Sequence, residues 1–336
     1  MENRMRQNFV TFILGVLLIL FAPSAVLAQS DIRVTLLGTG NPEPTIDRFG
    51  PSTLVEAGGE KLLFDCGRGV TQRLWQRHIP LSALTAVFLT HLHSDHTVGI
   101  PDLWLTGWLP APFGNRTRPF RVWGPAGTRE MMSYLEKAYQ ADIRSRLHSH
   151  QSLPSLAGVG LPLQGISIQA EDISQGVVYE SDGVKVTAFD VDHGPFIKPA
   201  FGYRIDYGGR SVVISGDTHG NENLIRFAKG ADVVVHEVAM AKDELLRKSA
   251  TARHIIDSHT TPEAAGTVFA QVKPRLAVYT HVALLTTDPE IGAPTVQDVI
   301  AQTRKTYSGP LEVGEDLMTI EIGNTLAVQR PEPIAH

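Results

Sequence analysis

The sequence predicts an α/β fold with two facing β-sheets, and three observations lead to this expectation. Short apolar runs of strand length alternate with helix-like segments along the chain, an order typical of α/β proteins. With 336 residues, of which 43% are hydrophobic and 19% charged, the chain has the length and apolar content for a large core. Its two halves also repeat one pattern, which indicates two β-layers of related design.

The expected elements follow from local spacing and from end signals. Residues 128–142 have apolar positions at helical spacing, and residues 261–272 begin with Thr261 as a cap and Pro262 at the first helical position. A third helix is expected over residues 295–307. Strands are expected in nine apolar runs, at 32–38, 52–57, 61–66, 84–91, 184–193, 200–207, 210–217, 231–238 and 275–281.

The repeated pattern is a Gly-Gly turn followed by an apolar strand. It occurs in "VEAGGEKLLFDCG", which ends at Gly67, and in "IDYGGRSVVISGD", which ends at Asp217, in one register without gaps. The runs "AVFLTH" and "AVYTH" also match, and they end at His91 and His281. Equivalent strand ends would bring these histidines and the Asp217 loop to one edge of the sheets. The alternative is a chance likeness between two half-buried hairpins.

The first 28 residues have the organisation of a secretory signal peptide. Two arginines precede an apolar stretch over residues 9–22, and small residues at Val26 and Ala28 form an A-x-A-like cleavage site. The stretch is shorter than the roughly 20 residues of a spanning helix, and an uncleaved single-span anchor is the alternative. We expect cleavage after Ala28, a single mature domain over residues 29–336, and a periplasmic or secreted protein without a stable membrane span.

Charge and cysteine content bear on partners. Beyond residue 28 the chain has 28 basic and 34 acidic residues, a net charge of -6. Because a basic patch supplies most of the affinity for nucleic acid, this balance argues against a nucleic-acid partner. Cys66 is the only cysteine, which excludes disulfides and cysteine-rich zinc sites and favours a buried structural role. A homodimer is a further expectation.

A cluster of four ionisable residues follows an apolar run in "VFLTHLHSDHTVGI". His91 and His93 are two residues apart, so they point the same way on an extended chain, and Asp95 and His96 follow across a tight turn. Imidazole and carboxylate suit zinc or iron. Since a catalytic zinc usually takes three protein ligands, four ligand-type residues together indicate two metals.

Further ligand candidates lie where other strands are expected to end. His193 closes "VTAFDVDH", Asp217 closes "SVVISGD" and His281 closes "LAVYTH". A single histidine of this kind is usually an ordinary polar residue. Seven ligand-type residues at loop edges are a specific signal for a metal site.

The motifs resemble those of the metallo-β-lactamase superfamily. "THLHSDHTVG" is similar to its HxHxDH signature, and "SGDT" and "YTHV" are similar to its bridging-aspartate and late-histidine motifs, in the family's order across residues 31–325. The resemblance implies an αββα sandwich, two mixed β-sheets flanked by helices, with two divalent metal ions, zinc by expectation, at one edge. The implied ligands are His91, His93 and His193 for the first metal, Asp95, His96 and His281 for the second, and Asp217 as the bridge.

Two finer motifs resemble the ribonuclease Z branch of this superfamily. "VVVHEVAMA" is similar to its HEAT motif, although Val238 and Ala239 replace Ala-Thr, and "HTTPEAAG" is similar to its HST motif. They imply that Glu237 and His259 form a carboxylate–imidazole pair near the metals. An imidazole oriented by a carboxylate suits a general acid. The alternative is that both are ordinary polar surface groups.

The expected reaction is hydrolysis of an ester with anionic oxygens by a hydroxide held between two metals. His259, oriented by Glu237, would protonate the leaving oxygen, and Asp95 would shuttle a proton. Trp104, Trp108 and Phe113 would form an aromatic wall for an aryl group, and the pair Arg116 and Arg118 would attract an anion. Core packing beside a solvated loop is the alternative for these residues.

The expected substrate class depends on whether the chain contains the tRNA-binding insertion of ribonuclease Z. In ribonuclease Z a long arm that grips tRNA commonly lies between strands that correspond here to residues 200–207 and 210–217, which are joined by Gly208-Gly209 alone. With its acidic charge and export signal, the chain looks more like the exported arylsulfatase-type branch. We therefore expect a small anionic ester, an aryl sulfate or phosphodiester, as substrate. Alternatives are a ribonuclease Z-like endonuclease acting on tRNA 3′ ends and a non-catalytic metal-binding protein of the same fold.

Overall fold

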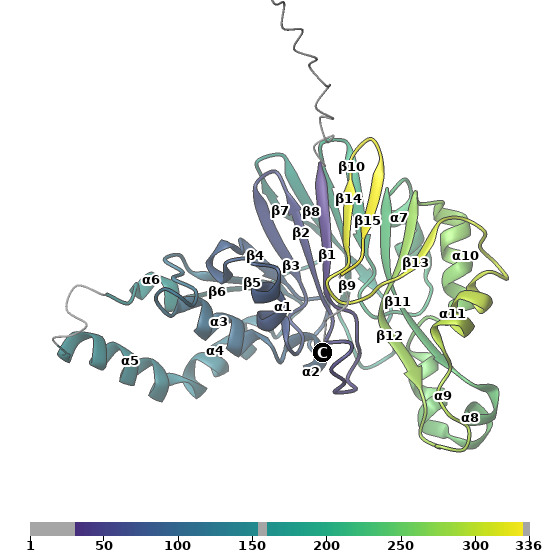
Figure 1. Ribbon diagram of the computed structural model, residues 1–336, viewed down its shortest axis with the longest axis horizontal. Coiled ribbons are helices and arrows are strands. Elements are labelled where there is room, and N and C mark those ends of the chain that lie inside the picture. The colour runs from purple at the N-terminus through teal and green to yellow at the C-terminus, as the bar shows by residue number, and fades with distance from the viewer. Residues whose placement is uncertain (1–30, 154–159, 332–336) are drawn as a thin grey trace, which may run out of the picture.

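A computed structural model describes residues 31–153 and 160–331, which form two mixed β-sheets packed face to face (Figure 1). The first sheet has eight strands in the order β15 (Leu326–Gln329), β14 (Thr319–Ile322), β1 (Ile32–Gly38), β2 (Ser52–Ala57), β3 (Glu60–Phe64), β4 (Ala86–Phe88), β5 (Phe120–Gly124) and β6 (Ile168–Asp172). The second has seven in the order β13 (Leu311–Val313), β12 (Leu276–Leu285), β11 (Val233–Ala241), β10 (Arg210–Ile214), β9 (Ala200–Tyr207), β8 (Val184–Val191) and β7 (Gly176–Ser181).

Helices cover the outer face of each sheet. The first sheet carries α1 (Val70–Gln76), a 3₁₀ turn (Leu81–Ala83), α2 (Ser94–Thr97), α3 (Ile100–Trp108), α4 (Thr128–Ala138), α5 (Gln140–Ser152) and α6 (Leu163–Ile166). The second half contributes α7 (Glu222–Ala228), α8 (Asp243–Lys248), α9 (Ala250–Asp257), α10 (Pro262–Val272) and α11 (Val296–Thr303). The predicted cap of α10 is confirmed, since the Thr261 hydroxyl accepts a hydrogen bond from the backbone N–H of Ala264.

Three buried clusters account for the layers. The central cluster joins the two sheets, where Phe64 and Phe88 of the first sheet pack against Tyr203 of the second. A second cluster lies between the first sheet and its helices, and a third joins the second sheet to α10 through Phe269. Burial of the apolar faces of both sheets supplies the main driving force for this packing. The expected αββα sandwich is therefore confirmed.

The two halves share one pairing pattern. Strands β1 to β6 pair as antiparallel, antiparallel, parallel, parallel and parallel, and strands β8 to β13 repeat this order. Both Gly-Gly turns join the second and third strands of their half, and all four glycines have positive φ, as a two-residue hairpin requires. The counterpart of β4 is then β11. The match of "AVFLTH" with "AVYTH" is wrong by one strand, because His281 lies on β12.

Parts of the molecule extend from the sandwich at both ends of Figure 1. At one end α5 projects beyond the first sheet, and at the other the long strands β11 and β12 carry α8 and α9. Among residues 31–153 and 160–331, no helix is long and apolar enough to cross a membrane. The signal peptide expected over residues 1–28 lies outside the described residues.

Candidate metal centre

The seven expected ligand residues converge at one edge of the sandwich. Loops that follow β4, β8 and β10 carry most of them, and α2 supplies two more. Their spacing in the chain is large: His96 and Asp217 are 121 residues apart, and Asp95 and His281 are 186 apart. The fold therefore brings these residues together, from segments that follow strand ends for all of them except His281, which lies within β12.

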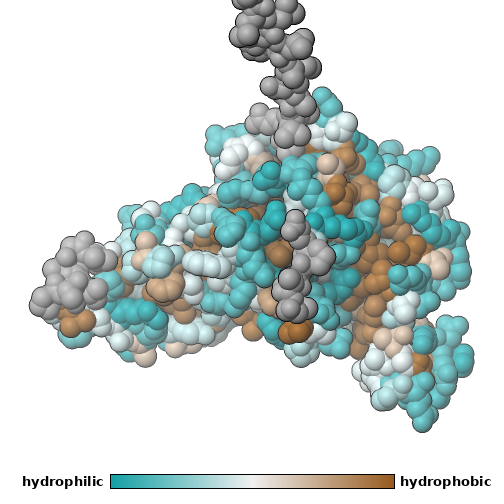
Figure 2. All heavy atoms as spheres, in the orientation of Figure 1, coloured by the Kyte–Doolittle hydropathy of each residue, from teal (hydrophilic) through white to brown (hydrophobic). Residues whose placement is uncertain are grey.

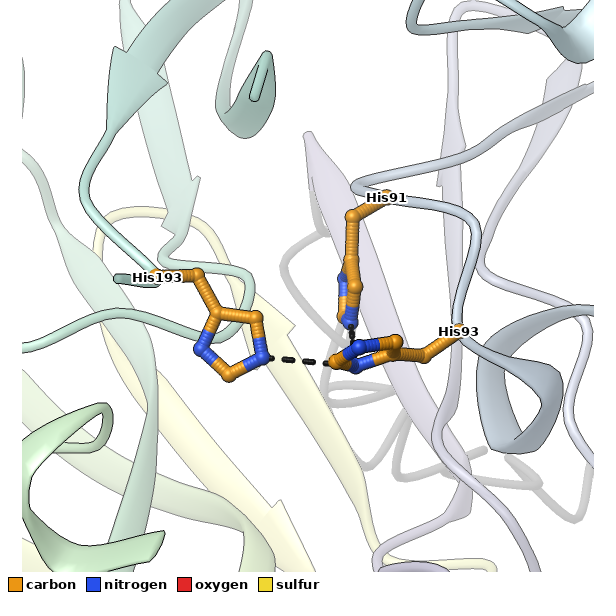
Figure 3. A group of neighbouring side chains, drawn as sticks. All are labelled: His91, His93 and His193. Carbon is orange, nitrogen blue, oxygen red and sulfur yellow. Dashed lines mark hydrogen bonds between the residues drawn. The ribbon is translucent and has the colours of Figure 1, made fainter. Parts of the chain in front are cut away.

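Three imidazoles form the first ligand cluster (Figure 3). His91 and His93 lie on the loop after β4, and His193 approaches from the loop after β8. Nε2 of His91 is 2.9 Å from Nδ1 of His93, and Nε2 of His193 is 3.4 Å from the same atom. The three rings thus direct ring nitrogens at one small volume.

A second cluster combines one carboxylate with two imidazoles. Oδ2 of Asp95 lies 3.5 Å from Nε2 of His96 and 3.3 Å from Nε2 of His281. All three side chains are buried. This is the same set that the family resemblance assigns to a second metal.

Asp217 lies between the two clusters. Its Oδ2 atom is 3.9 Å from Nε2 of His91 and of His193, and 3.2 Å from Nε2 of His96 and of His281. One carboxylate oxygen therefore faces imidazoles of both sets. This is the position that the family resemblance implies for a bridging ligand.

His281 reaches the site through a β-bulge and not through the end of a strand. Strand β12 continues to Leu285, but its pairing with β11 shifts between Glu237–Thr280 and Val238–Val282, so His281 has no partner. Its φ of 43° lies in the left-handed region, which is uncommon for a residue other than glycine. The bulge re-aims this one side chain toward the clusters while both strands continue past the site.

The residues present fit two divalent ions. Two nitrogens bound to one tetrahedral zinc lie about 3.3 Å apart, because Zn–N bonds are about 2.0–2.1 Å long. The observed nitrogen separations of 2.9 and 3.4 Å in the first cluster agree with this value. Imidazole and carboxylate are also the donor types that zinc takes. Each cluster supplies three donors, and Asp217 is shared.

Groups behind the clusters hold the imidazoles in place. Asp65, at the end of β3, lies 2.8 Å through Oδ2 from Nδ1 of His96, and its other oxygen accepts the backbone N–H of Thr90. The Thr90 hydroxyl is 3.0 Å from Nδ1 of His91, and Nδ1 of His193 is 2.9 Å from the carbonyl oxygen of Ser258. Such partners fix the ring orientation and tautomer of metal-binding histidines. The sequence reasoning missed all three, although an aspartate directly after the apolar strand at 61–64 was a visible signal.

Glu237 and His259 form the expected pair. Oε2 of Glu237 is 3.3 Å from Nδ1 of His259, and the His259 ring lies 5.4 Å, centroid to centroid, from the ring of His281. Oε1 of Glu237 accepts the backbone N–H groups of Thr218 and Thr260, the residues that follow Asp217 and His259. The buried carboxylate therefore ties together the two loops that carry those side chains.

Charges in the site shift the pKa values of its histidines in two directions. Burial acts to lower the pKa of His96, but the carboxylates of Asp217 and Asp65 outweigh it and hold that pKa well above its usual value in the absence of an ion. Burial lowers the pKa of His91, His93 and His193, which leaves these rings neutral, as metal ligands must be. Burial acts against a charged His259, but the Glu237 carboxylate outweighs it and raises the pKa of His259 to about 9. His259 is thus protonated at neutral pH. Burial acts to raise the pKa of Asp217, and the adjacent His281 and His96 hold that pKa well below its usual range.

A cavity of about 400 Å³ opens onto the clusters. Its lining includes ligand-type residues of both sets and His259, together with the loop after His193 and part of α9. The expected aromatic wall does not line it. Trp104 and Trp108 are fully buried under the first sheet, and Arg116 is buried with its guanidinium on the carbonyl oxygens of Trp104 and Gly165. The wall prediction was wrong because the apolar face of α3 packs against the sheet.

The fold and the family comparison agree on the class of protein. Residues 60–282 match the family described as "Beta-lactamase superfamily domain". The metallo-β-lactamase fold protein YhfI from Bacillus subtilis superposes with a TM-score of 0.63 and 17% identity, over 87% of this chain and 99% of that one. Human tRNase Z, short form, superposes with a TM-score of 0.59 and 22% identity, over 87% and 99%. Sandwich and ligand clusters together define a metal-dependent hydrolase.

Sequence relatives narrow the class. Ribonuclease Z of Mycobacterium marinum is 35% identical over 292 residues, which cover 87% of this chain and 99% of the relative. Ribonuclease Z of Mycolicibacterium gilvum is 34% identical over 291 residues, covering 87% and 96%. The chain belongs to the metallo-β-lactamase superfamily and, within it, to the ribonuclease Z-like branch.

These relatives correct two expectations. The interpretation as an arylsulfatase-type hydrolase was wrong, because the relatives that match over nearly their whole length are named ribonuclease Z. The expectation that nucleic acid is not a partner was also wrong, because proteins named ribonuclease Z and tRNase Z are among the relatives and structural neighbours. Net charge is an average over the chain and does not report a local binding surface. The short Gly208-Gly209 turn is present, but it does not separate the chain from proteins of that name.

Proposed function

We propose that this protein is a two-zinc endoribonuclease that hydrolyses an RNA phosphodiester bond, with a precursor tRNA 3′ end as the first candidate substrate. The observation that carries the proposal is the coincidence of two findings. The relatives named ribonuclease Z match 87% of this chain over nearly their own whole length, and Asp217 lies between two three-residue clusters in the site. We assign His91, His93 and His193 to one ion, Asp95, His96 and His281 to the other, and Asp217 to both.

The residues divide the work of hydrolysis. When bound, the two ions supply an activated water and offset the negative charge of the phosphate. Around them the chain's own groups orient the ligands, through Asp65 behind His96 and the Ser258 carbonyl behind His193. Asp95 faces the cavity and accepts a proton from the attacking water.

His259 is the proposed general acid. It lines the same cavity, and the Glu237 carboxylate keeps its ring protonated. It is therefore placed to protonate the leaving sugar oxygen as the P–O bond breaks. Without that proton the leaving group would be an alkoxide, which is a poor leaving group in water.

A local positive charge supports an RNA substrate. Between Ile143 and Ala170 the sequence has Arg144, Arg146 and two histidines and not one Asp or Glu. Both arginines are exposed on α5, the helix that projects from the body in Figure 1, and Arg146 is ion-paired with Asp142 one turn earlier, so Arg144 supplies the unpaired positive charge of the two. Phosphate contacts by such arginines give affinity without sequence preference.

The test is a side-by-side assay on the purified protein, with its zinc content measured. Substrates are a precursor tRNA, its DNA counterpart, an aryl sulfate and a β-lactam. We expect about two zinc ions per chain and cleavage of the RNA into linear ends without a 2′,3′-cyclic phosphate, because water and not the 2′-hydroxyl attacks. That end group also excludes a contaminating ribonuclease of the cyclising kind.

Asp217→Asn is expected to abolish cleavage, and Asp102→Asn, at an exposed carboxylate on α3, is the matched control. A protein that holds two zinc ions and leaves every RNA intact would falsify the proposal.

A further inference from the structure

The cavity beside the ligand clusters has walls that the hydrolysis itself does not need. One wall is the segment Pro195–Ile197, from the loop between β8 and β9, and Ile255 of α9 and Leu285 of β12 also line the cavity. The cavity surface is mostly carbon, although polar ligand-type residues are part of its lining. Among the described residues that line the cavity, none is a lysine or an arginine. The walls therefore suit a flat, uncharged group.

Phe196 is the most prominent residue of this wall. Its exposed fraction is 86%, the highest among the large apolar side chains of the described residues. A phenyl ring left in water at the mouth of a polar site forgoes the free energy of burial. A single exposed ring would be ordinary, but Phe196 lines the cavity together with Pro195, Ile197, Ile255 and Leu285, and a contiguous apolar surface of this kind marks a place that a ligand covers.

The loop that carries Phe196 is anchored to the site at its base. The backbone N–H of Asp192 donates to the Thr218 hydroxyl, next to Asp217, and the Asp192 side chain accepts the N–H of Gly194. His193 is held through Nδ1 by the Ser258 carbonyl. The ring of Phe196 therefore projects from a loop whose start is fixed relative to both clusters.

We infer that the Pro195–Ile197 wall is a nucleobase subsite, in which Phe196 stacks on the base of a nucleotide that flanks the cleaved phosphodiester. The inference rests on the proposed function. A base is linked to its phosphate through a single sugar, so a nucleotide with its phosphate at the clusters must place its base near this cavity. Stacking on an aromatic side chain tolerates every base and needs no hydrogen-bond readout.

The test is a double-mutant cycle between the protein and the RNA. Phe196→Ala is expected to raise KM for the intact RNA about tenfold with little change in kcat, and Phe196→Tyr is expected to restore it. An abasic nucleotide is placed in turn on each side of the cleaved bond. On one side it should raise KM for the wild-type protein by a similar factor, and Phe196→Ala should then add no further loss.

Ile46→Ala is the matched control, because Ile46 is 80% exposed on a loop near the site but does not line the cavity. The inference is overturned if Phe196→Ala cleaves intact RNA with unchanged KM, or if its effect on intact RNA persists unchanged with the abasic nucleotide on either side of the cleaved bond. Either result leaves the proposed function standing, since the wild-type protein still cleaves RNA. A wild-type protein that cleaves no RNA removes the proposed function first, and the subsite with it.

Discussion

At the scale of single residues, the site depends on carboxylates that face several imidazoles. Asp217 presents one oxygen to histidines of both clusters. Asp65 contacts Nδ1 of His96, and Glu237 contacts Nδ1 of His259. A buried carboxylate is costly unless it is paired and hydrogen-bonded. Each of these three is paired with histidine, and Asp65 and Glu237 also accept backbone N–H groups. Their removal should therefore have specific effects.

The role of His259 as general acid predicts a dependence on the leaving group. His259→Ala should lower kcat for RNA by about 10²–10⁴-fold, the usual contribution of a positioned acid. It should have little effect on bis(p-nitrophenyl) phosphate, because p-nitrophenolate leaves without a proton. The measurement is kcat on both substrates, with His254→Ala, a neighbouring exposed histidine of the cavity lining, as control. Equal losses on both substrates would contradict an acid role.

The position of Asp65 predicts an effect on metal affinity. Asp65→Asn retains the oxygen that Thr90 uses but replaces the acceptor facing Nδ1 of His96 by an amide N–H. Loss of a partner of this kind typically lowers metal affinity by about 10- to 100-fold. Competition with a zinc chelator should show this loss, while circular dichroism shows a folded protein. Unchanged zinc affinity in a folded variant would exclude the role.

At the scale of elements, the site is assembled by departures from regular structure. The bulge in β12 aims His281, the glycines Gly194 and Gly216, both with positive φ, lie next to His193 and Asp217, and the short helix α2 carries Asp95 and His96. At the outer edge, α5 adds exposed arginines that no part of the catalytic geometry requires. This helix is the element most easily tested without disturbing the site.

A double substitution on α5, Arg144→Gln with Arg146→Gln, should weaken RNA cleavage through KM. The loss should be largest at low salt, because binding of arginines to phosphates releases counterions. The slope of log kcat/KM against log salt concentration should become shallower by about one for each phosphate that the helix no longer neutralises. Arg226→Gln, on α7, is the control, and an unchanged slope in the double variant would place RNA elsewhere.

At the scale of the whole molecule, compartment and assembly stay predictions. Figure 2 shows a mostly hydrophilic face with hydrophobic residues gathered over one end of the second sheet. The homodimer expected from sequence is testable by the mass of the purified protein in solution. The signal peptide is testable independently of the fold.

Export predicts a defined N-terminus. Because the pattern of residues 1–28 matches a secretory signal, the mature protein should begin at Gln29 and appear in the periplasm or medium. Intact-mass measurement of the protein from fractionated cells checks both statements. Replacing residues 9–22 by a polar sequence should keep the protein in the cytoplasm, with residues 1–28 still attached. A wild-type chain found intact in the cytoplasm would contradict export.

The sequence by itself determined nine of the fifteen strands that the described residues form, the two hairpin turns, the candidate ligand residues and, through the family motifs, the class of fold. These are properties of local spacing, since apolar runs, glycine pairs and polar residues at strand ends are visible in short windows. The tertiary structure decided how those residues are used. It showed Asp65 behind His96, a bulge at His281 within a continuing strand, and Trp104 and Trp108 inside the core. Each of these features depends on contacts between segments far apart in the chain, which no local pattern records. Net charge likewise sums over the whole chain, so it did not reveal the exposed arginines of α5.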